Sequence, residues 1–185
     1  MTIEVPKSQL KEVKVGGQVT ATVLDGFGSQ FKEASAENQA RLFVTASSPN
    51  KFQVDAEDQA QVTAKVIGTP SKLEVEAENQ SSVSIQGAIT QAKVKDQGRL
   101  TFLSGSSYSA NNVKAKGQGT VVVDSSVSGG CTGVVKKDIT ASCTTSSTRA
   151  AGFAGEANGT GASTMTCKVG DVDEISTKYY LRQTK

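Results

Sequence analysis

The side chains that could do chemistry form two charged stripes, in which each charged residue lies at the same distance before a glutamine. Glu37, Glu57 and Glu78 each stand two positions before a glutamine, and Lys95 and Lys116 take the same place before two later glutamines. Three stacked carboxylates could bind Ca²⁺, which prefers oxygen ligands, but exposed unpaired stripes are common, so a solvated charged face is the favoured explanation. An acidic and a basic stripe could also set the register of self-association.

Histidine is absent from all 185 residues. Its absence excludes Ser-His-Asp triads, Cys-His dyads and histidine-ligated zinc. Acid–base catalysis near neutral pH would then require a buried Asp, Glu or Lys, and the positions expected to be buried contain almost none. We therefore predict no catalytic residues, no cofactor and no enzyme activity.

Three cysteines, Cys131, Cys143 and Cys167, lie in the last third of the chain, and none forms a C-x-x-C pair. A zinc knuckle is therefore disfavoured. One disulfide and one free thiol are expected, and both Cys131–Cys143 and Cys143–Cys167 are compatible with the sequence. Such a disulfide would suit an oxidising compartment.

The elements that carry these residues are read from a repeat anchored on glutamine. Gln18, Gln39, Gln59, Gln80, Gln97 and Gln118 are separated by 21, 20, 21, 17 and 21 residues. The positions three and five residues before and after each glutamine are apolar, and odd offsets mean strands with one buried face. A strand period within a repeat of about twenty residues predicts an all-β, single-chain β-solenoid. A β-sandwich would explain the strands but not the recurring columns.

The position before each glutamine holds a residue that tolerates left-handed backbone, which predicts a corner of the coil. These residues are Gly17, Asn38, Asp58, Asn79, Asp96 and Gly117. Gln39, Gln59 and Gln80 are then expected to stack on the outer surface as an amide ladder. Such a ladder could have the purely structural role of joining the coils. Alternatively, it could present amides to a ligand.

The repeats predict a solenoid over residues 8–126, followed at 127–185 by an atypical C-terminal coil or cap with a Gly/Ser/Thr-rich loop at 144–166. No apolar run approaches the roughly 18 residues that span a bilayer, and no signal peptide is visible at the N-terminus. A net charge of +2 gives no support to nucleic-acid binding.

The phrases "NQARLFV", "DQAQVTA", "NQSSVSI", "DQGRLTF" and "GQGTVVV" give residues 10–125 a family resemblance. This part of the chain resembles the DUF2807 or GIN domain family of auto-transporter adhesin head domains, whose recurring phrase is close to G-A-S-x-V-x-V. Here Asn or Asp replaces most of the corner glycines. The resemblance implies a right-handed β-helix at a cell surface or in an extracellular matrix, and it brings no catalytic residues.

These features favour a non-enzymatic extracellular or cell-surface module for adhesion, structural display or self-assembly. Its partner would be another copy of itself, another surface protein or a glycan. The alternative is a polysaccharide-binding or polysaccharide-cleaving β-helix protein, because such enzymes can work without histidine. They are normally longer and carry aromatic sugar platforms. Ice binding would require a threonine ladder, and no Thr-x-Thr column repeats through the coils.

Overall fold

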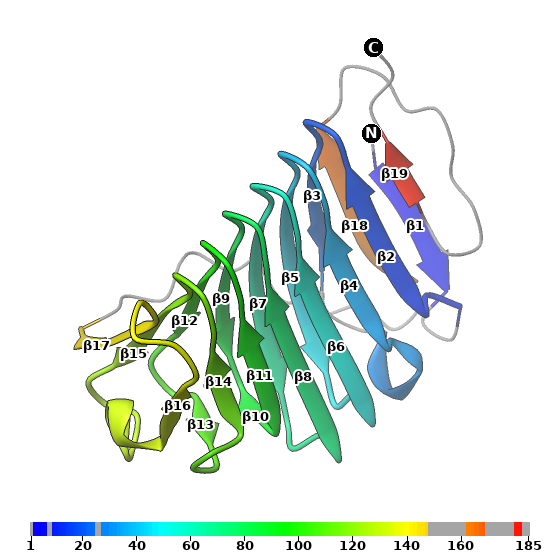
Figure 1. Cartoon of the computed structure of the whole chain (residues 1–185). Helices are drawn as coiled ribbons and strands as arrows, with labels where there is room; N and C mark the ends of the chain where they lie inside the picture. Colours follow the sequence, from blue (N-terminus) through cyan, green and yellow to red (C-terminus); the bar gives the residue numbers. More distant parts are fainter. Residues whose placement is uncertain (1, 7–8, 25–26, 148–161, 169–179, 183–185) are drawn as a thin grey trace.

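The chain is wound into a β-solenoid of about six turns (Figure 1). The structure, a computed structural model, describes residues 2–6, 9–24, 27–147, 162–168 and 180–182. Two long sheets face each other, and each coil contributes one strand to each sheet. The predicted all-β solenoid is confirmed.

One sheet has nine strands and the other has eight. The nine-stranded sheet contains, in spatial order, β1 (Thr2–Pro6), β18 (Ala162–Lys168), β3 (Thr20–Val23), β5 (Arg41–Ser47), β7 (Gln61–Ile67), β9 (Ser82–Gln86), β12 (Arg99–Phe102), β15 (Thr120–Asp124) and β17 (Ser142–Ser146). The eight-stranded sheet contains β19 (Tyr180–Arg182), β2 (Glu12–Gly16), β4 (Glu33–Ala36), β6 (Lys51–Ala56), β8 (Lys72–Ala77), β11 (Gln91–Val94), β14 (Val113–Ala115) and β16 (Val134–Lys136). Short elements complete the fold: the pair β10 (Ala88–Ile89) and β13 (Ser107–Tyr108), and the 3-10 turns η1 (Gly28–Gln30) and η2 (Gly130–Gly133).

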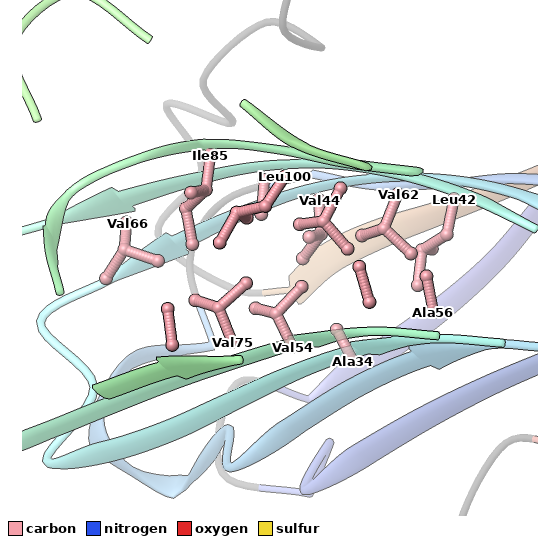
Figure 2. Packing of buried hydrophobic residues seen from close by; sticks show 14 of the residues in the cluster. Ala34, Leu42, Val44, Val54, Ala56, Val62, Val66, Val75, Ile85 and Leu100 are labelled. Atoms are coloured by element: carbon pink, nitrogen blue, oxygen red, sulfur yellow. The ribbon is translucent and has the colours of Figure 1, made fainter. Parts of the chain in front are cut away.

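The core lies between the two sheets and is built from stacked columns of small apolar side chains. Val54 pairs with Val75 in one sheet, and Val62 pairs with Val83 in the other. These four valines are at most 2% exposed. Figure 2 shows Val54 and Val75 pointing toward Val62 across the space between the sheets. Each buried valine contributes about 1.5–3 kcal/mol, so the period of two in the sequence is also the main source of stability.

The predicted corner is confirmed at all six positions. The φ angles are +72° at Gly17, +61° at Asn38, +50° at Asp58, +51° at Asn79, +53° at Asp96 and +59° at Gly117. Left-handed backbone costs an ordinary L-residue about 1–2 kcal/mol, which explains why only Gly, Asn and Asp occupy this column. The following residues Gln59 and Gln80 also have positive φ, at 69° and 66°, which the sequence did not predict.

The C-terminal region expected to be an atypical cap begins with one more coil. Strand β16 pairs in parallel with β14, and β17 pairs in parallel with β15, so the stacking continues through Ser146. The last corner, between β16 and β17, is one residue longer than the previous one. Ile139 lies in it and is fully exposed. Of the loop expected at 144–166, both ends belong to strands β17 and β18, and residues 148–161 lie outside the described residues.

The end of the chain returns to the beginning of the solenoid (Figure 1). Strand β18 inserts between β1 and β3 and is antiparallel to both. Strand β19 pairs in parallel with β2. The two ends of the solenoid are therefore built differently: one from the first and last strands of the chain, the other from β16 and β17.

Candidate functional site

The predicted glutamine ladder is present along one corner of the solenoid. The Nε2 atom of Gln18 donates to Oε1 of Gln39 at 3.0 Å, Gln39 donates to Gln59 at 3.4 Å, and Gln59 donates to Gln80 at 3.3 Å. One column inward, Nδ2 of Asn79 donates to Oδ1 of Asp58 at 3.2 Å. All these side chains are exposed, so the ladder both links the coils and presents amides to solvent.

The ladder stops where the repeat shortens. Gln97 follows Gln80 by 17 residues rather than 20 or 21, and no side-chain hydrogen bond joins these two residues within the described chain. A shallow hollow opens at this corner, lined by Asp58, Gln59, Asn79, Gln80, Asp96 and Gln97. Its lining consists entirely of amides and carboxylates.

The outer face of the eight-stranded sheet is strongly charged, and we call it the charged face. Its acidic residues are Glu12, Glu33, Glu37, Asp55, Glu57, Glu74, Glu76 and Glu78, and its basic residues are Lys14, Lys51, Lys72, Lys93, Lys95, Lys114 and Lys116. Two hollows of about 290 Å³ and 510 Å³ lie on this face and share Gln53 and Glu74 in their lining. Carboxylates dominate the coils of β4, β6 and β8, and lysines dominate those of β11 and β14.

Two of the three carboxylates that were considered for Ca²⁺ form ion pairs with lysines of neighbouring coils. Lys14 forms an ion pair with Glu37 at 3.1 Å, and Lys95 forms one with Glu78. Glu57 is exposed between them. In the part of the chain that the structure describes, no three His, Cys, Asp or Glu side chains gather closely enough to hold a metal ion. Two of the three carboxylates are therefore held by lysines of the same chain, and the Ca²⁺ interpretation stays a prediction.

Lys95 is the centre of the densest cluster on the charged face. Its Nζ contacts the carboxylate of Glu76 at 2.6 Å as well as that of Glu78, and Lys93 adds a contact to Glu76 at 3.5 Å. Burial alone would raise the pKa of Glu76, but hydrogen bonding with Glu78 and Lys95 holds it below its usual range. Hydrogen bonding to Glu76 raises the pKa of Glu78. The pKa of Lys95 is raised by its hydrogen bonds to both carboxylates. Lys116, one coil further along, is exposed and has no ion pair with any described residue.

Asp55 lies at the middle of the charged face and lines one of the hollows. Its pKa is raised from 3.8 to about 6, mainly by burial. The 2.7 Å hydrogen bond that Asp55 accepts from Gln53 lowers the pKa, and the nearby charges of Glu33 and Glu76 raise it. Ser35 pairs with Asp55 on the adjacent strand. The Oγ of Ser35 is buried without a hydrogen-bond partner. The sequence pattern did not single out either residue.

The outer face of the nine-stranded sheet has a different chemistry, and we call it the hydroxyl face. It consists of the positions two and four residues after each glutamine. These residues are Thr20, Arg41, Gln61, Ser82, Arg99 and Thr120 in one column, and Thr22, Phe43, Thr63, Ser84, Thr101 and Val122 in the other. Neither column contains a carboxylate. Sequence reasoning missed this face, although the even offsets after the glutamines carry the signal.

The disulfide is formed by Cys131 and Cys143, whose Cα atoms are 5.8 Å apart. Of the two pairings left open by the sequence, Cys143–Cys167 is therefore excluded. Cys143 pairs with Val121 in the strand register, and both cysteines pack against the end of the hydrophobic core. The disulfide closes the last coil onto η2. Cys167 belongs to β18, at the opposite end of the solenoid.

Comparison of the chain with protein-family models, with curated proteins and with solved structures returned no match. The resemblance to adhesin head domains therefore stays a prediction. Among the residues described, no helix is long and apolar enough to cross a membrane.

Proposed function

We propose that this chain is a non-enzymatic, extracellular or cell-surface module that acts by display and self-association. The observation that carries the proposal is the separation of charge along the charged face. Carboxylates cover the coils of β4, β6 and β8, whereas Lys114 and Lys116 extend a basic region over the coil of β14. A solenoid repeats its contacts in every coil, so weak single contacts sum through multivalency.

Two copies that pack antiparallel through their charged faces bring the lysines of one copy opposite the carboxylates of the other. Lys95 is already neutralised within its own chain by Glu76 and Glu78. The groups left to act between chains are Lys114 and Lys116 on one side, and Glu33 and Glu57 on the other. Complementary charge of this kind sets the register and the rate of association more than its affinity.

The disulfide supports the extracellular part of the proposal. Structural disulfides persist in oxidising compartments and are rare in reducing ones. Cys131–Cys143 joins η2 to the last strand of the solenoid, where no further coil covers the core among the described residues. A covalent link at this end protects the coil with the fewest stacked neighbours.

Sedimentation velocity at about 0.05 M and about 0.5 M salt tests the self-association, because the Debye length shortens several-fold over this range. We expect association that weakens as salt rises. Lys114→Glu with Lys116→Glu should abolish it, and so should Glu33→Lys with Glu57→Lys. An equimolar mixture of the two double variants should associate again. A chain that is monomeric in low salt at high concentration, or a mixture that stays monomeric, would contradict the proposal.

Polysaccharide cleavage is the second candidate function, and one observation favours it. Asp55, with a pKa of about 6, lies in a hollow and pairs in register with Glu76, which is held ionised. Below about pH 6 Asp55 is protonated while Glu76 stays ionised, and a protonated and an ionised carboxyl group are the two partners that glycoside hydrolysis requires. Release of reducing ends from a polysaccharide, lost in both Asp55→Asn and Glu76→Gln, would favour this activity over display alone.

A further inference from the structure

Four residues form a continuous column along the hydroxyl face, and each comes from a different coil. Arg41 of β5 pairs with Gln61 of β7, Gln61 pairs with Ser82 of β9, and Ser82 pairs with Arg99 of β12. Neighbouring strands lie about 4.8 Å apart, so the two arginines stand roughly 14 Å apart with two hydrogen-bonding side chains between them. Arg41, Gln61 and Arg99 are exposed.

A second column runs beside the first, two residues further along each strand. It consists of Phe43, Thr63, Ser84 and Thr101, all of which are partly exposed. Phe43 is the exception among the phenylalanines whose side chains are described, because the other four are buried in the core. Its ring therefore lies on the surface, next to Arg41. We call the two columns together the arginine–hydroxyl strip.

The polar groups of the strip are unused within the described part of the chain. No side chain of the strip takes part in a hydrogen bond or ion pair with another described residue. The charged face contrasts with this arrangement, since most of its lysines are bound to carboxylates of the same chain. Two guanidinium groups, an amide and four hydroxyls are thus available to one external ligand.

We propose that the arginine–hydroxyl strip binds an anionic polysaccharide that lies along the solenoid axis. Arg41 and Arg99 would each hold a carboxylate or sulfate group through paired N–H donors. Gln61, Ser82 and the hydroxyls of the second column would hydrogen-bond to sugar hydroxyls. The apolar face of one sugar ring packs on Phe43, as aromatic side chains allow.

The composition of the strip argues for a polysaccharide rather than a protein partner. The centres of protein interfaces are enriched in aromatic residues, Met and Arg, whereas the strip has one aromatic side chain, Phe43, no Met, and two arginines separated by Gln61 and Ser82. Its side chains stand at the regular spacing of the strands, which suits a repeating ligand. The strip lies on the sheet opposite the charged face, so this inference does not depend on the proposed self-association.

Titration calorimetry of the whole chain with heparin, polygalacturonate and neutral dextran tests the inference. We expect binding to at least one of the two anionic polymers and none to dextran. Arg41→Gln and Arg99→Gln should each weaken binding roughly tenfold, or about 1.4 kcal/mol, because each removes charge-assisted hydrogen bonds. Phe43→Ala should weaken it less. Both arginines are exposed, so thermal melts of the variants should match that of the unchanged chain.

Lys136→Gln is the matched control, because it removes one positive charge from an exposed position on β16 of the opposite sheet, away from the groups proposed for self-association. It should leave polysaccharide binding unchanged. An equal loss in this control would show that net charge rather than the strip governs binding, and would overturn the inference. Absence of binding to both anionic polymers would overturn it, as would equally tight binding of single-stranded DNA that depends on the same two arginines.

Discussion

Asp55 and Glu76 lie directly opposite each other on β6 and β8, yet their pKa values are displaced in opposite directions. Burial raises the pKa of Asp55, whose only side-chain hydrogen-bond donor in the described chain is Gln53. Burial acts on Glu76 in the same sense, but hydrogen bonding with Glu78 and Lys95 lowers its pKa, and the charges of Lys95 and Lys93 lower it further. These hydrogen bonds and the lysine charges from the neighbouring coil therefore separate the two behaviours.

Asp55→Asn should stabilise the protein at pH 7. The folded-state pKa of about 6 is above the ordinary 3.8, so the folded protein binds this proton more tightly than the unfolded chain. The stabilising contribution of Asp55 is complete below about pH 4 and is lost as the pH rises toward 6. We expect a gain on the order of 2 kcal/mol at pH 7 and none at pH 4 in urea titrations. Gln53→Ala should extend the loss of this stabilising contribution to higher pH, because it removes the hydrogen bond that lowers the pKa of Asp55. If the pH profile of stability is unchanged in Asp55→Asn, the raised pKa of Asp55 is contradicted.

Lys95→Met should destabilise the protein at pH 7, because it leaves the carboxylates of Glu76 and Glu78 without their shared cation. Since the cluster is partly exposed, we expect a loss of about 1 kcal/mol in the free energy of unfolding. The loss should shrink as the carboxylates are protonated in acid. Lys116→Met is the control, since Lys116 stands in the same column without an ion-pair partner among the described residues. Equal effects of the two variants would show that the cluster does not contribute specifically.

Asp96→Ala and Asp96→Gly should differ, although both remove the same side chain. Asp96 has a φ of +53°, where alanine is strained by about 1 kcal/mol and glycine is not. The glycine variant should resemble the unchanged chain, because Gly17 and Gly117 already fill this column in other coils. Chemical denaturation measures the difference, and an alanine variant as stable as the glycine variant would count against the corner geometry.

Ser35→Ala and Ser81→Ala form a matched pair of buried serines. The Oγ of Ser35 has no hydrogen-bond partner, whereas the Oγ of Ser81 donates to the carbonyl oxygen of Ala56 at 2.8 Å. Removing an unpartnered buried hydroxyl should be neutral or stabilising, and removing the bonded one should cost about 1 kcal/mol. Thermal melts of the two variants should therefore move in different directions. A destabilised Ser35→Ala would indicate a partner for that hydroxyl.

The coil architecture could be predicted because each repeat carries the same two kinds of signal. Odd offsets from the glutamine place Val62 and Val83 in the core, and Asn79 or Asp96 identifies the corner. The positive φ of Gln59 could not be predicted, because glutamine has no preference for that conformation. The return of β18 and β19 to the first coil could not be predicted either, because this pairing of distant segments occurs once and gives no repeating signal in the sequence.

The site was predicted only in part, for a related reason. The glutamine ladder follows from identity within one column, and Gln39, Gln59 and Gln80 do stack. The ion pairs Lys14–Glu37 and Lys95–Glu76 were not predicted, because each joins two different columns of neighbouring coils. A single column of letters does not contain that information. The arginine–hydroxyl strip escaped notice because its columns mix several residue types that share a hydrogen-bonding capacity but not an identity.

The position of β18 between β1 and β3 has a consequence for the order of folding. Thr2 pairs with Thr166, and β18 is the only sheet neighbour of β1 within the described chain. The coils from β2 to β17 can stack one after another as they are synthesised, since each contacts the coil before it. Strand β1 must wait until residues 162–168 have left the ribosome. Strand β1 is thus fixed later than the coils that follow it, and a nascent chain cannot complete this end of the solenoid before β18 has been made.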